Sequence, residues 1–593
     1  MTDSNNDVHT EQDTVSLQIR IRELEKEIVR LHTQIKEQRY GLTWLDVPEA
    51  FETESENKIP ILEEVKEKAI DKGGDTSPHI IIEGDNYHAL TCLNYTHRGK
   101  IDVIYIDPPY NTGSDGFTYK DKRFLKEFPD GSPVPKEHPL RHSYWLSFMS
   151  KRLELAKNLL SDKGVIFISI DDNEQANLKL LCDKVFGEEN FVAQVMWHKN
   201  YASANDSKTF SNVLDYILVY RKSENFLRNL LPRTEKQNHL YKYDSQDGKG
   251  LWRPDNLSVR TYSANYDYPI INPNTGTIYN PPKGRSWMTN KEKVEEWIKE
   301  SRVYFGLNGK GAPQLKRYLS EVQKGVVPTT YWNYEDCGHN DEARREIKMI
   351  FGHPPFDSPK PSKLIMQILQ IASSSKSSTI LDFFAGSGTT LHATMKLNAE
   401  DGGHRQCILV QQREGDNNIC ENVTYERNRR VICGYTNAKG EQVEGLGGRL
   451  KYYRTNFVGK NASRKAIDAD CVELARKAGY LLALGENTLE EIAHTDTYQI
   501  FADTCRDDVH IVSESNSMAS CYTAIFFTEN YAKIPEFVSE IEKLQASEPP
   551  QINVYIFCWG TPDIFESEFD NLQGIALKAI PQPILEVYKS INQ

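Results

Sequence analysis

The strongest chemical signal in the chain is a carboxylate followed by two prolines and a tyrosine, Asp107-Pro108-Pro109-Tyr110. The residues follow an apolar run at 101–106, which predicts a buried strand that ends at the carboxylate. Because proline has no N–H, an Asp107 oxygen and the Pro108 carbonyl can both accept hydrogen bonds from one amino group. An exocyclic amine held in this way directs its lone pair towards an electrophile, and Tyr110 offers a flat face for a base. A tight loop after a strand is the structural alternative.

A second motif, Asp382-Phe383-Phe384-Ala385-Gly386-Ser387-Gly388-Thr389-Thr390, follows another apolar run. Its glycines would let the backbone approach a nucleoside closely. The motif is not GxGxxG and lacks the lysine of a phosphate-binding loop, so it is not built for pyrophosphate. A cofactor with a nucleoside and an amino acid fits better. The next predicted strand runs into Gln411-Gln412-Arg413-Glu414, where an acidic residue can bind ribose hydroxyls.

Short apolar runs alternate with helical patterns on both sides of these motifs. Buried strands that alternate with helices predict an α/β fold with a doubly wound, mainly parallel sheet. Two runs, 192–197 and 216–220, could be antiparallel at the sheet edge. The other expected strands are 80–82, 101–107, 164–171, 379–384 and 408–411, and the expected helices are 145–160 and 364–372.

Beyond the segments in which strands and helices alternate, the chain divides into further regions. A linker is expected at about 46–78, and the stretch 223–345, rich in Tyr, Asn, Pro and Gly, is interpreted as an inserted domain. A separate α/β unit is expected from 451, with strands at 523–527 and 553–558. The predicted organisation is a tail and helix at 1–45, two halves of a catalytic domain at 46–222 and 346–450, the insert at 223–345 and a C-terminal domain at 451–593.

The N-terminal helix carries Leu17, Ile21, Leu24, Ile28, Leu31 and Ile35 at spacings that alternate between four and three residues. This is the a/d pattern of a coiled coil, with charged residues around it. Dimerisation through this seam is one interpretation, and packing against the chain's own domain is the other.

The charge of the chain is unevenly distributed. The net charge is −13, but residues 223–331 contain 17 Lys and Arg against 11 Asp and Glu. Residues 451–593 contain 12 against 21. A basic middle and an acidic end suggest different partners for the two regions, and ordinary surface variation is the alternative.

No run of apolar residues is long enough for a membrane span, and the polar, acidic N-terminus is unlike a signal peptide. Ten cysteines without a CxxC pair argue against a zinc site, so no metal is expected. A reduced chain in the cytosol fits this cysteine usage best.

Together, the two motifs resemble those of the amino-group DNA methyltransferases, in which one motif holds the target amine and the other holds S-adenosylmethionine. The proline motif comes first and the glycine motif 275 residues later, which resembles the β class, with its recognition domain between the two halves. Much of residues 40–460 also resembles the modification (Mod) subunits of type III restriction systems. The segments that carry this likeness are 40–44, 83–86, 117–119, 170–174, 215–217 and 360–364, and more weakly 580–585.

This resemblance implies an S-adenosylmethionine-dependent methyltransferase fold and a role for each matching residue. Asp107 and Pro108, with Pro109 in the same turn, would hold the amine, and Tyr110 would stack on a flipped base. Asp107 favours adenine, because cytosine-specific relatives usually have Ser and protein-glutamine methyltransferases have Asn at this position. Trp197 is a second stacking candidate, or else a core tryptophan at a strand end. The expected cofactor-binding residues are Asp85, Lys360, Pro361, Asp382, Phe384, Gly386, Gly388, Thr389 and Glu414, with Asp85 near the adenine and Lys360 and Pro361 beside the methionine end.

The insert at 223–345 is expected to read the DNA sequence, because it lies between the two halves and its basic residues alternate with aromatic ones. A packed insert with a solvated basic face is the alternative. Arginine can bind guanine in a bidentate manner or hold phosphates. The candidate DNA contacts are Arg253, Arg260, Lys283, Arg285, Lys316 and Arg317.

The resemblance implies three partners: double-stranded DNA, a second copy of the chain and a helicase-nuclease (Res) subunit. The sequence contains no Walker A motif, so any translocation or cleavage must come from another protein. The expected location is the cytoplasm of a bacterial or archaeal cell, in association with the nucleoid. The expected function is adenine methylation by a type III modification subunit. Two alternatives stay open: a solitary or other phage-defence methyltransferase, and a DNA-binding specificity subunit whose catalytic site is vestigial.

Overall fold

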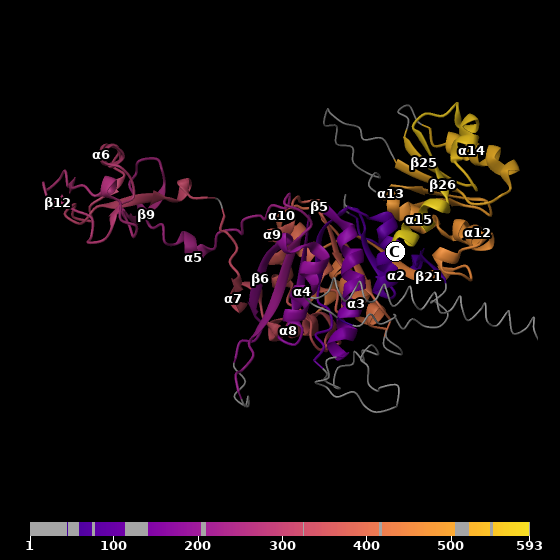
Figure 1. Cartoon of the computed structure of the whole chain (residues 1–593), viewed down its shortest axis with the longest axis horizontal. Helices are drawn as coiled ribbons and strands as arrows, with labels where there is room; N and C mark the ends of the chain where they lie inside the picture. The colour runs from indigo at the N-terminus through magenta and orange to yellow at the C-terminus, as the bar shows by residue number, and fades with distance from the viewer. Residues whose placement is uncertain are drawn as a thin grey trace, which may run out of the picture. The chain divides into compact units, whose positions relative to one another are not determined.

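The computed structural model describes residues 44, 58–73, 77–112, 140–202, 209–323, 325–413, 418–503, 521–545 and 550–591. They form two compact units: residues 229–328 make one, and the chain on either side of that segment makes the other (Figure 1). No helix among the described residues is long and apolar enough to cross a membrane. The predicted coiled coil at 17–35 lies outside the described residues.

An 11-stranded sheet is the centre of the larger unit. Its strands are β1 (Ile59–Glu64), β2 (Ile70–Asp71), β3 (His79–Glu83), β4 (Ile101–Ile106), β5 (Leu160–Ile170), β6 (Phe191–His198), β7 (Leu214–Arg221), β16 (Tyr331–Trp332), β17 (Thr379–Asp382), β18 (Gln406–Gln411) and β21 (Arg449–Val458). The order is β1-β21-β3-β18-β17-β4-β5-β7-β6-β16, and β2 pairs with β21.

The strands from β21 to β5 are parallel, and their near-continuous apolar runs fit burial on both faces. The strand β7 is antiparallel to both β5 and β6, as the sequence suggested for this pair. The pair is not at the edge, however, because β16 continues the sheet beyond β6. The two residues of β16 give too short a pattern to recognise in the sequence.

Helices cover both faces of this sheet. From β3 to β4, β5 and β6 the chain moves towards one edge, and from β16 to β17, β18 and β21 it moves back. Because crossovers between parallel strands are right-handed, the two sets of helices lie on opposite faces. One set is α2 (Asn86–Thr96), α3 (Leu140–Leu159) and α4 (Gln175–Phe186), and the other is α9 (Ser362–Ala372), α10 (Thr389–Asp401) and α11 (Glu426–Cys433), with α8 (Asn340–Phe351) packed on α11. This is the doubly wound methyltransferase fold that the sequence predicted.

Two expected boundaries differ in the structure. Residues 59–64 and 70–71 were expected in a linker but form β1 and β2. The strand β21, assigned largely to the C-terminal domain, pairs with β1 and β3 in the central sheet. Its partners lie about 370 residues earlier in the chain, so no local pattern links them.

The C-terminal region has its own five-stranded sheet in sequential order. It is not a separate unit, because Leu481, Phe501 and Tyr588 share one core with Leu90 and Leu93 of α2. Its elements are α12 (Asp468–Lys477), α13 (Gly479–Glu486), β22 (Glu490–His494), β23 (Tyr498–Ala502), β24 (Cys521–Phe526), α14 (Ile534–Glu542), β25 (Gln551–Phe557), β26 (Ile575–Ile580) and α15 (Gln582–Ile591).

The inserted unit, Asn229–Pro328, is shorter than the expected 223–345 at both ends. Its small core includes Leu257, Trp287, Val294 and Leu315. Frequent Pro and Gly keep its strands short. They are β8 (Tyr243–Asp244), β9 (Leu251–Asn256), β10 (Ser258–Val259), β11 (Ile270–Ile271), β12 (Ile278–Tyr279), β13 (Ser286–Trp287), β14 (Val303–Tyr304) and β15 (Gln314–Tyr318), with helices α5 (Glu235–Asn238) and α6 (Lys291–Lys299). One four-stranded sheet has the order β14-β15-β9-β8.

Candidate active site

The carboxyl ends of the parallel strands bring the two sequence motifs together. Strands β4 and β17 are neighbours, with Val103 level with Ile380 and Ile104 level with Leu381. The proline motif follows β4 and the glycine motif follows β17, so both leave the same edge of the sheet. In open α/β sheets this edge is where ligands bind.

Both oxygens of the Asp107 carboxylate have partners within the protein. The Tyr110 hydroxyl donates to Asp107 Oδ1 at 2.7 Å, and Lys360 Nζ donates to Asp107 Oδ2 at 2.6 Å. Lys360 Nζ also donates to the Tyr110 hydroxyl at 3.0 Å and lies 5.1 Å from the centre of its ring. Burial raises the pKa of Tyr110 well above its ordinary value, so the phenol stays neutral and remains a donor.

The two proline carbonyls differ in their contacts. The Trp145 indole donates to the Pro109 carbonyl at 2.7 Å, which anchors the turn on α3. None of the described residues donates to the Pro108 carbonyl. The carbonyl that the sequence assigned to the target amine is therefore the one left available, and Trp145 is an anchor that the sequence did not reveal.

A buried carboxylate holds the residue after the motif. Asn111 adopts a positive φ of 58°, a backbone conformation that asparagine tolerates better than most residues. Its side-chain amide donates to Glu174, which is fully buried and is also 2.6 Å from His142 Nδ1. Glu174 thus fixes the residue that follows the proline motif through contacts that no sequence spacing indicates.

The glycine motif forms a tight loop between β17 and α10. Gly386 and Gly388 have positive φ values of 50° and 73°. A Cβ on Gly388 would lie 2.5 Å from Asn428 Nδ2 and 3.0 Å from the Thr424 carbonyl, so only glycine fits there. Asp382 accepts hydrogen bonds from the Phe384 N–H at 3.0 Å and the Thr390 hydroxyl at 2.5 Å. Burial raises the pKa of Asp382 to about 7.

This loop suits S-adenosylmethionine better than a phosphate-bearing cofactor. Most of its backbone N–H groups are already used, so it does not form the anion-binding nest that phosphates require. The N–H groups of Phe384, Ala385, Gly386 and Gly388 donate to Asp382 Oδ1, the Val410 carbonyl, Gln411 Oε1 and the Ala385 carbonyl respectively.

A buried network of charged side chains contacts the glycine loop. The Arg427 guanidinium, fully buried on α11, contacts Glu346 Oε2 of α8 at 3.0 Å and the Thr389 hydroxyl at 2.7 Å. It also donates to the Ser387 hydroxyl at 3.1 Å. Lys396 Nζ of α10 adds a contact of 2.6 Å to Glu346. The network ties three helices to the loop, and the sequence gave no signal for it.

Comparison with known proteins identifies the family to which this chain belongs. Residues 101–421, which contain both motifs and the insert between them, match the family described as DNA methylase. The chain belongs to the DNA methylase family. Members of this family use S-adenosylmethionine as the methyl donor.

Three relatives show how far the likeness extends. The StyLTI Mod subunit of a type III restriction-modification enzyme from Salmonella typhimurium is 40% identical, over 59% of this chain and 55% of the relative. The EcoPI Mod subunit of Escherichia phage P1 is 32% identical, over 65% and 66%. The type II methyltransferase M.KpnI of Klebsiella pneumoniae is 35% identical, over 65% and 89%. The chain therefore spans about half to two thirds of the length of the two Mod subunits.

The other residues predicted to bind the cofactor of this DNA methylase lie in several parts of the structure. Lys360 was expected beside the methionine end of the cofactor, but its ammonium contacts Asp107. Its backbone carbonyl accepts from the Thr389 hydroxyl at 3.2 Å, so Lys360 also touches the glycine motif. Pro361 precedes α9 and packs against Gly338. Asp85 caps the N-terminus of α2, and Glu414 lies outside the described residues.

The structure does not support Trp197 as a stacking surface. Its side chain is fully buried in β6, and its indole donates to the Gly338 carbonyl at 3.0 Å. The core-tryptophan alternative fits the structure better, because the ring and its N–H group are both enclosed within the protein.

Two of the predicted DNA-contacting residues are exposed, and the other four interact with neighbouring groups of the insert. Arg253 and Arg317 are directly opposite each other on β9 and β15, and Asp255 lies between them, 3.1 Å from Arg317 Nε. Arg260 and Lys283 are exposed. Lys316 Nζ bonds Ser245 at 2.9 Å, and Arg285 bonds the Ser258 carbonyl at 2.9 Å.

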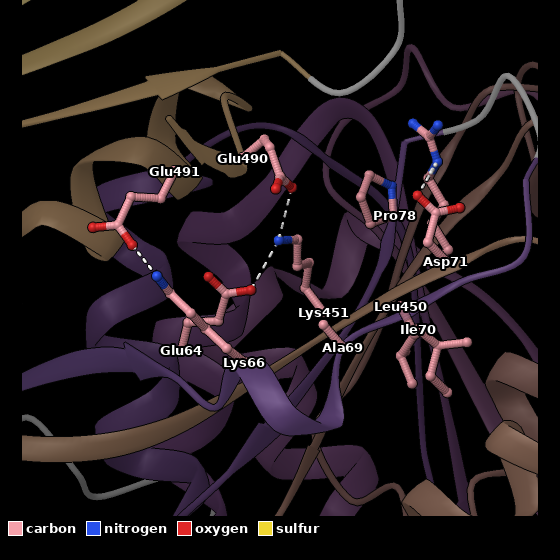
Figure 2. A pocket seen from close by; sticks show the side chains of 11 residues that line it. Glu64, Lys66, Ala69, Ile70, Asp71, Pro78, Leu450, Lys451, Glu490 and Glu491 are labelled. Atoms are coloured by element: carbon pink, nitrogen blue, oxygen red, sulfur yellow. Dashed lines mark hydrogen bonds and ion pairs between the residues drawn. The ribbon is translucent and has the colours of Figure 1, made fainter. Parts of the chain in front are cut away.

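A cavity of about 280 Å³ lies away from these motifs, where β21 and the segment from β1 to β2 meet β22 (Figure 2). Its charged side chains pair with one another: Lys451 Nζ is 2.9 Å from Glu64 and 3.2 Å from Glu490, and Lys66 pairs with Glu491. No residue predicted for the site lines this cavity. Its ion pairs join the C-terminal region to the central sheet. Among the described residues no group of acidic, His and Cys side chains could hold a metal ion.

Proposed function

We propose that this protein transfers a methyl group from S-adenosylmethionine to the exocyclic amine of adenine in DNA, as the modification subunit of a type III restriction-modification system. The observation that supports this most directly is Lys360. Its side chain binds Asp107 of the amine-holding motif, and its backbone carbonyl accepts from Thr389 of the glycine motif. One residue thus joins the two halves of the site.

The residues of the turn would act mainly by positioning. Asp107 and the Pro108 carbonyl hold the amine, and Tyr110 stacks on the base. As the nitrogen bonds to the methyl carbon and the carbon–sulfur bond breaks, positive charge develops on the amine, which then loses a proton. The Asp107 carboxylate stabilises that charge. Alignment of this kind can offset roughly 7–11 kcal/mol of the barrier. The target must first leave the duplex, which costs on the order of a few kcal/mol.

Transfer of tritium from labelled cofactor to genomic DNA tests the proposal, with Asp107→Ala as the inactive control. Methylation-aware sequencing of DNA from cells that carry only this gene would report the base and its context. Methylation of cytosine instead of adenine would overturn the assignment of the base. Absence of any transfer by the wild-type protein would instead favour a DNA-binding subunit with a vestigial site.

The insert is the best candidate for sequence recognition. Its support is its position between the motifs, its basic balance and the exposed Arg260 and Lys283. Exchange of residues 229–328 for the corresponding segment of a relative should change the methylated sequence. An unchanged methylated sequence would exclude this role.

The proposed partners are a second copy of the chain and a helicase-nuclease subunit, in the cytoplasm and close to the nucleoid. Dimerisation would use the heptads at 17–35, and deletion of residues 1–39 should then halve the mass measured by light scattering. The acidic C-terminal region is the proposed surface for the nuclease partner. Co-purification of the two proteins, lost when this region is removed, would support the pairing.

M.KpnI favours a second candidate function, because the similarity covers 89% of that type II methyltransferase. The chain could then act as a methyltransferase without a translocating partner. Deletion of each neighbouring gene in cells that restrict unmodified phage separates the two, because it identifies the gene that restriction requires. A type III system needs a helicase-nuclease gene, whereas a type II system works with an independent endonuclease.

A further inference from the structure

Five aromatic side chains gather at the edge of the sheet that carries Asp107. They come from two distant segments, the end of β6 with the loop after it, and β16 with the segment that follows it. The rings contact one another in a chain, with centres 5.1 Å apart for His198 and Tyr334, 5.3 Å for Tyr201 and Tyr334, and 5.9 Å for Tyr334 and His339. The Tyr331 hydroxyl is 3.2 Å from His198 Nδ1. We call these five residues, His198, Tyr201, Tyr331, Tyr334 and His339, the ring surface.

The ring surface is accessible to solvent. Tyr201 is 67% exposed and Tyr331 is 49% exposed, although both are large and partly apolar. The other three are half-buried. Trp197, one residue before His198, is by contrast fully buried. A ligand can therefore reach the aromatic side chains of the ring surface but not Trp197.

The topology places this surface on the same side as the catalytic turn. Because β7 is antiparallel to both β5 and β6, the strand β6 runs parallel to β4, and so does β16. His198, the last residue of β6, and Asp107, the first residue after β4, therefore both lie at the carboxyl ends of their strands. Three strand spacings separate β4 from β6, which is roughly 14 Å across the sheet.

Residues next to the ring surface in the chain contact residues that lie close to the candidate site. Lys199 Nζ lies 2.7 Å from Asp215 Oδ1, and Asp215 is close enough to Lys360 and Asp107 for both to act on its carboxyl group. Gly338, next to His339, packs against Pro361, which follows Lys360. The rings therefore lie beside the amine-holding site, on the side away from the glycine motif.

We propose that the ring surface stacks on an unstacked base of the DNA strand that carries the target, near the base held at Asp107. The inference rests on the proposed function, because it assumes that a base leaves the duplex at this site. Aromatic rings bind unstacked bases of any sequence through their flat faces. The surrounding segment 331–345 has four acidic and two basic residues, so attraction of phosphates does not explain binding here.

The first test measures binding of a fluorescein-labelled single-stranded oligonucleotide by anisotropy, without cofactor. Tyr201→Leu and Tyr334→Leu should each weaken binding on the order of tenfold, whereas Tyr201→Phe should bind as wild type does. The ratio should be the same at low and high salt, because stacking releases no counterions. Trp559→Leu is the matched control, since it removes an aromatic side chain that is 53% exposed in the C-terminal region.

A second readout locates the contact. Oligonucleotides with 5-iodouracil crosslink to stacked aromatic residues, and digestion with mass spectrometry should identify Tyr201 or Tyr334. Unchanged binding by both leucine variants, or crosslinks only elsewhere, would overturn the inference while methyl transfer by the wild type still supported the proposed function. If the wild type transfers no methyl group but the leucine variants bind less, the proposed function fails and the ring surface still binds nucleic acid.

Discussion

At the scale of single residues, the site depends on contacts between positions far apart in the chain. The sequence predicted Asp107 and Pro108 from their own chemistry, and the free Pro108 carbonyl agrees with that prediction. Lys360 was assigned to the cofactor by resemblance, yet its ammonium contacts Asp107. The two residues are 253 positions apart, so only the fold brings them together. Trp145 and Glu174 escaped prediction for the same reason.

Replacement of Lys360 by Met should lower the rate of methyl transfer with little change in DNA binding. The variant keeps most of the length of the side chain but removes the donor to Asp107 Oδ2 and Tyr110. A hydrogen bond between charged groups contributes about 1.5–3 kcal/mol, so we expect a fall of about 10- to 150-fold in single-turnover rate.

Lys360→Arg, which keeps the charge, should recover part of this rate. Fluorescence anisotropy with DNA measures binding separately. A Met variant with the wild-type rate would show that the contact with Asp107 has no part in positioning.

At the scale of elements, the strands and helices around the motifs were predictable because they are long and regular. The predicted helix 364–372 lies within α9 (Ser362–Ala372). The strand β1 was missed because a six-residue run with a proline resembles a linker, and β21 because its partners are distant. The helices α8, α10 and α11 also owe their mutual arrangement to a buried ion pair that no single segment reveals.

Arg427→Met should destabilise the fold by about 1.5–3 kcal/mol, because it removes the charged hydrogen bonds of a fully buried guanidinium and leaves Lys396 as the cation paired with Glu346. Thermal unfolding followed by circular dichroism measures the loss. The matched control is Arg429→Met on the same helix, whose ion pair with Glu426 is partly exposed and should be worth about 0–1 kcal/mol. Equal melting temperatures for the two variants would contradict a structural role for the buried network.

At the scale of the whole molecule, the sequence predicted the fold class but not how the C-terminal region joins it. Composition suggested a separate acidic domain, whereas its helices complete the core over α2. This shared core and the central sheet also bury side chains that can titrate. Burial lowers the pKa of His79 to about 4 and that of His97 to about 3. Their neutral forms are therefore part of the folded state.

Stability should consequently fall as the pH drops below about 6.5, the ordinary histidine value. The unfolded chain binds protons there and the folded chain does not, so each histidine should cost about 2 kcal/mol by pH 5. Asp382 acts in the opposite direction, since burial raises its pKa to about 7. Urea unfolding at several pH values measures the slope, which should be smaller in His79→Gln. An identical slope would show that His79 does not contribute.

The pairing of β3 with β18 and β21 has a consequence for synthesis of the chain on the ribosome. Strand β3 ends at Glu83, but its first neighbour, β18, begins only at Gln406. At ~5–20 residues per second, this gap of about 320 residues takes roughly 15–65 s to translate. Throughout that interval a strand of three consecutive isoleucines has no neighbour in the sheet. The nascent protein should therefore depend on chaperones until its second half emerges.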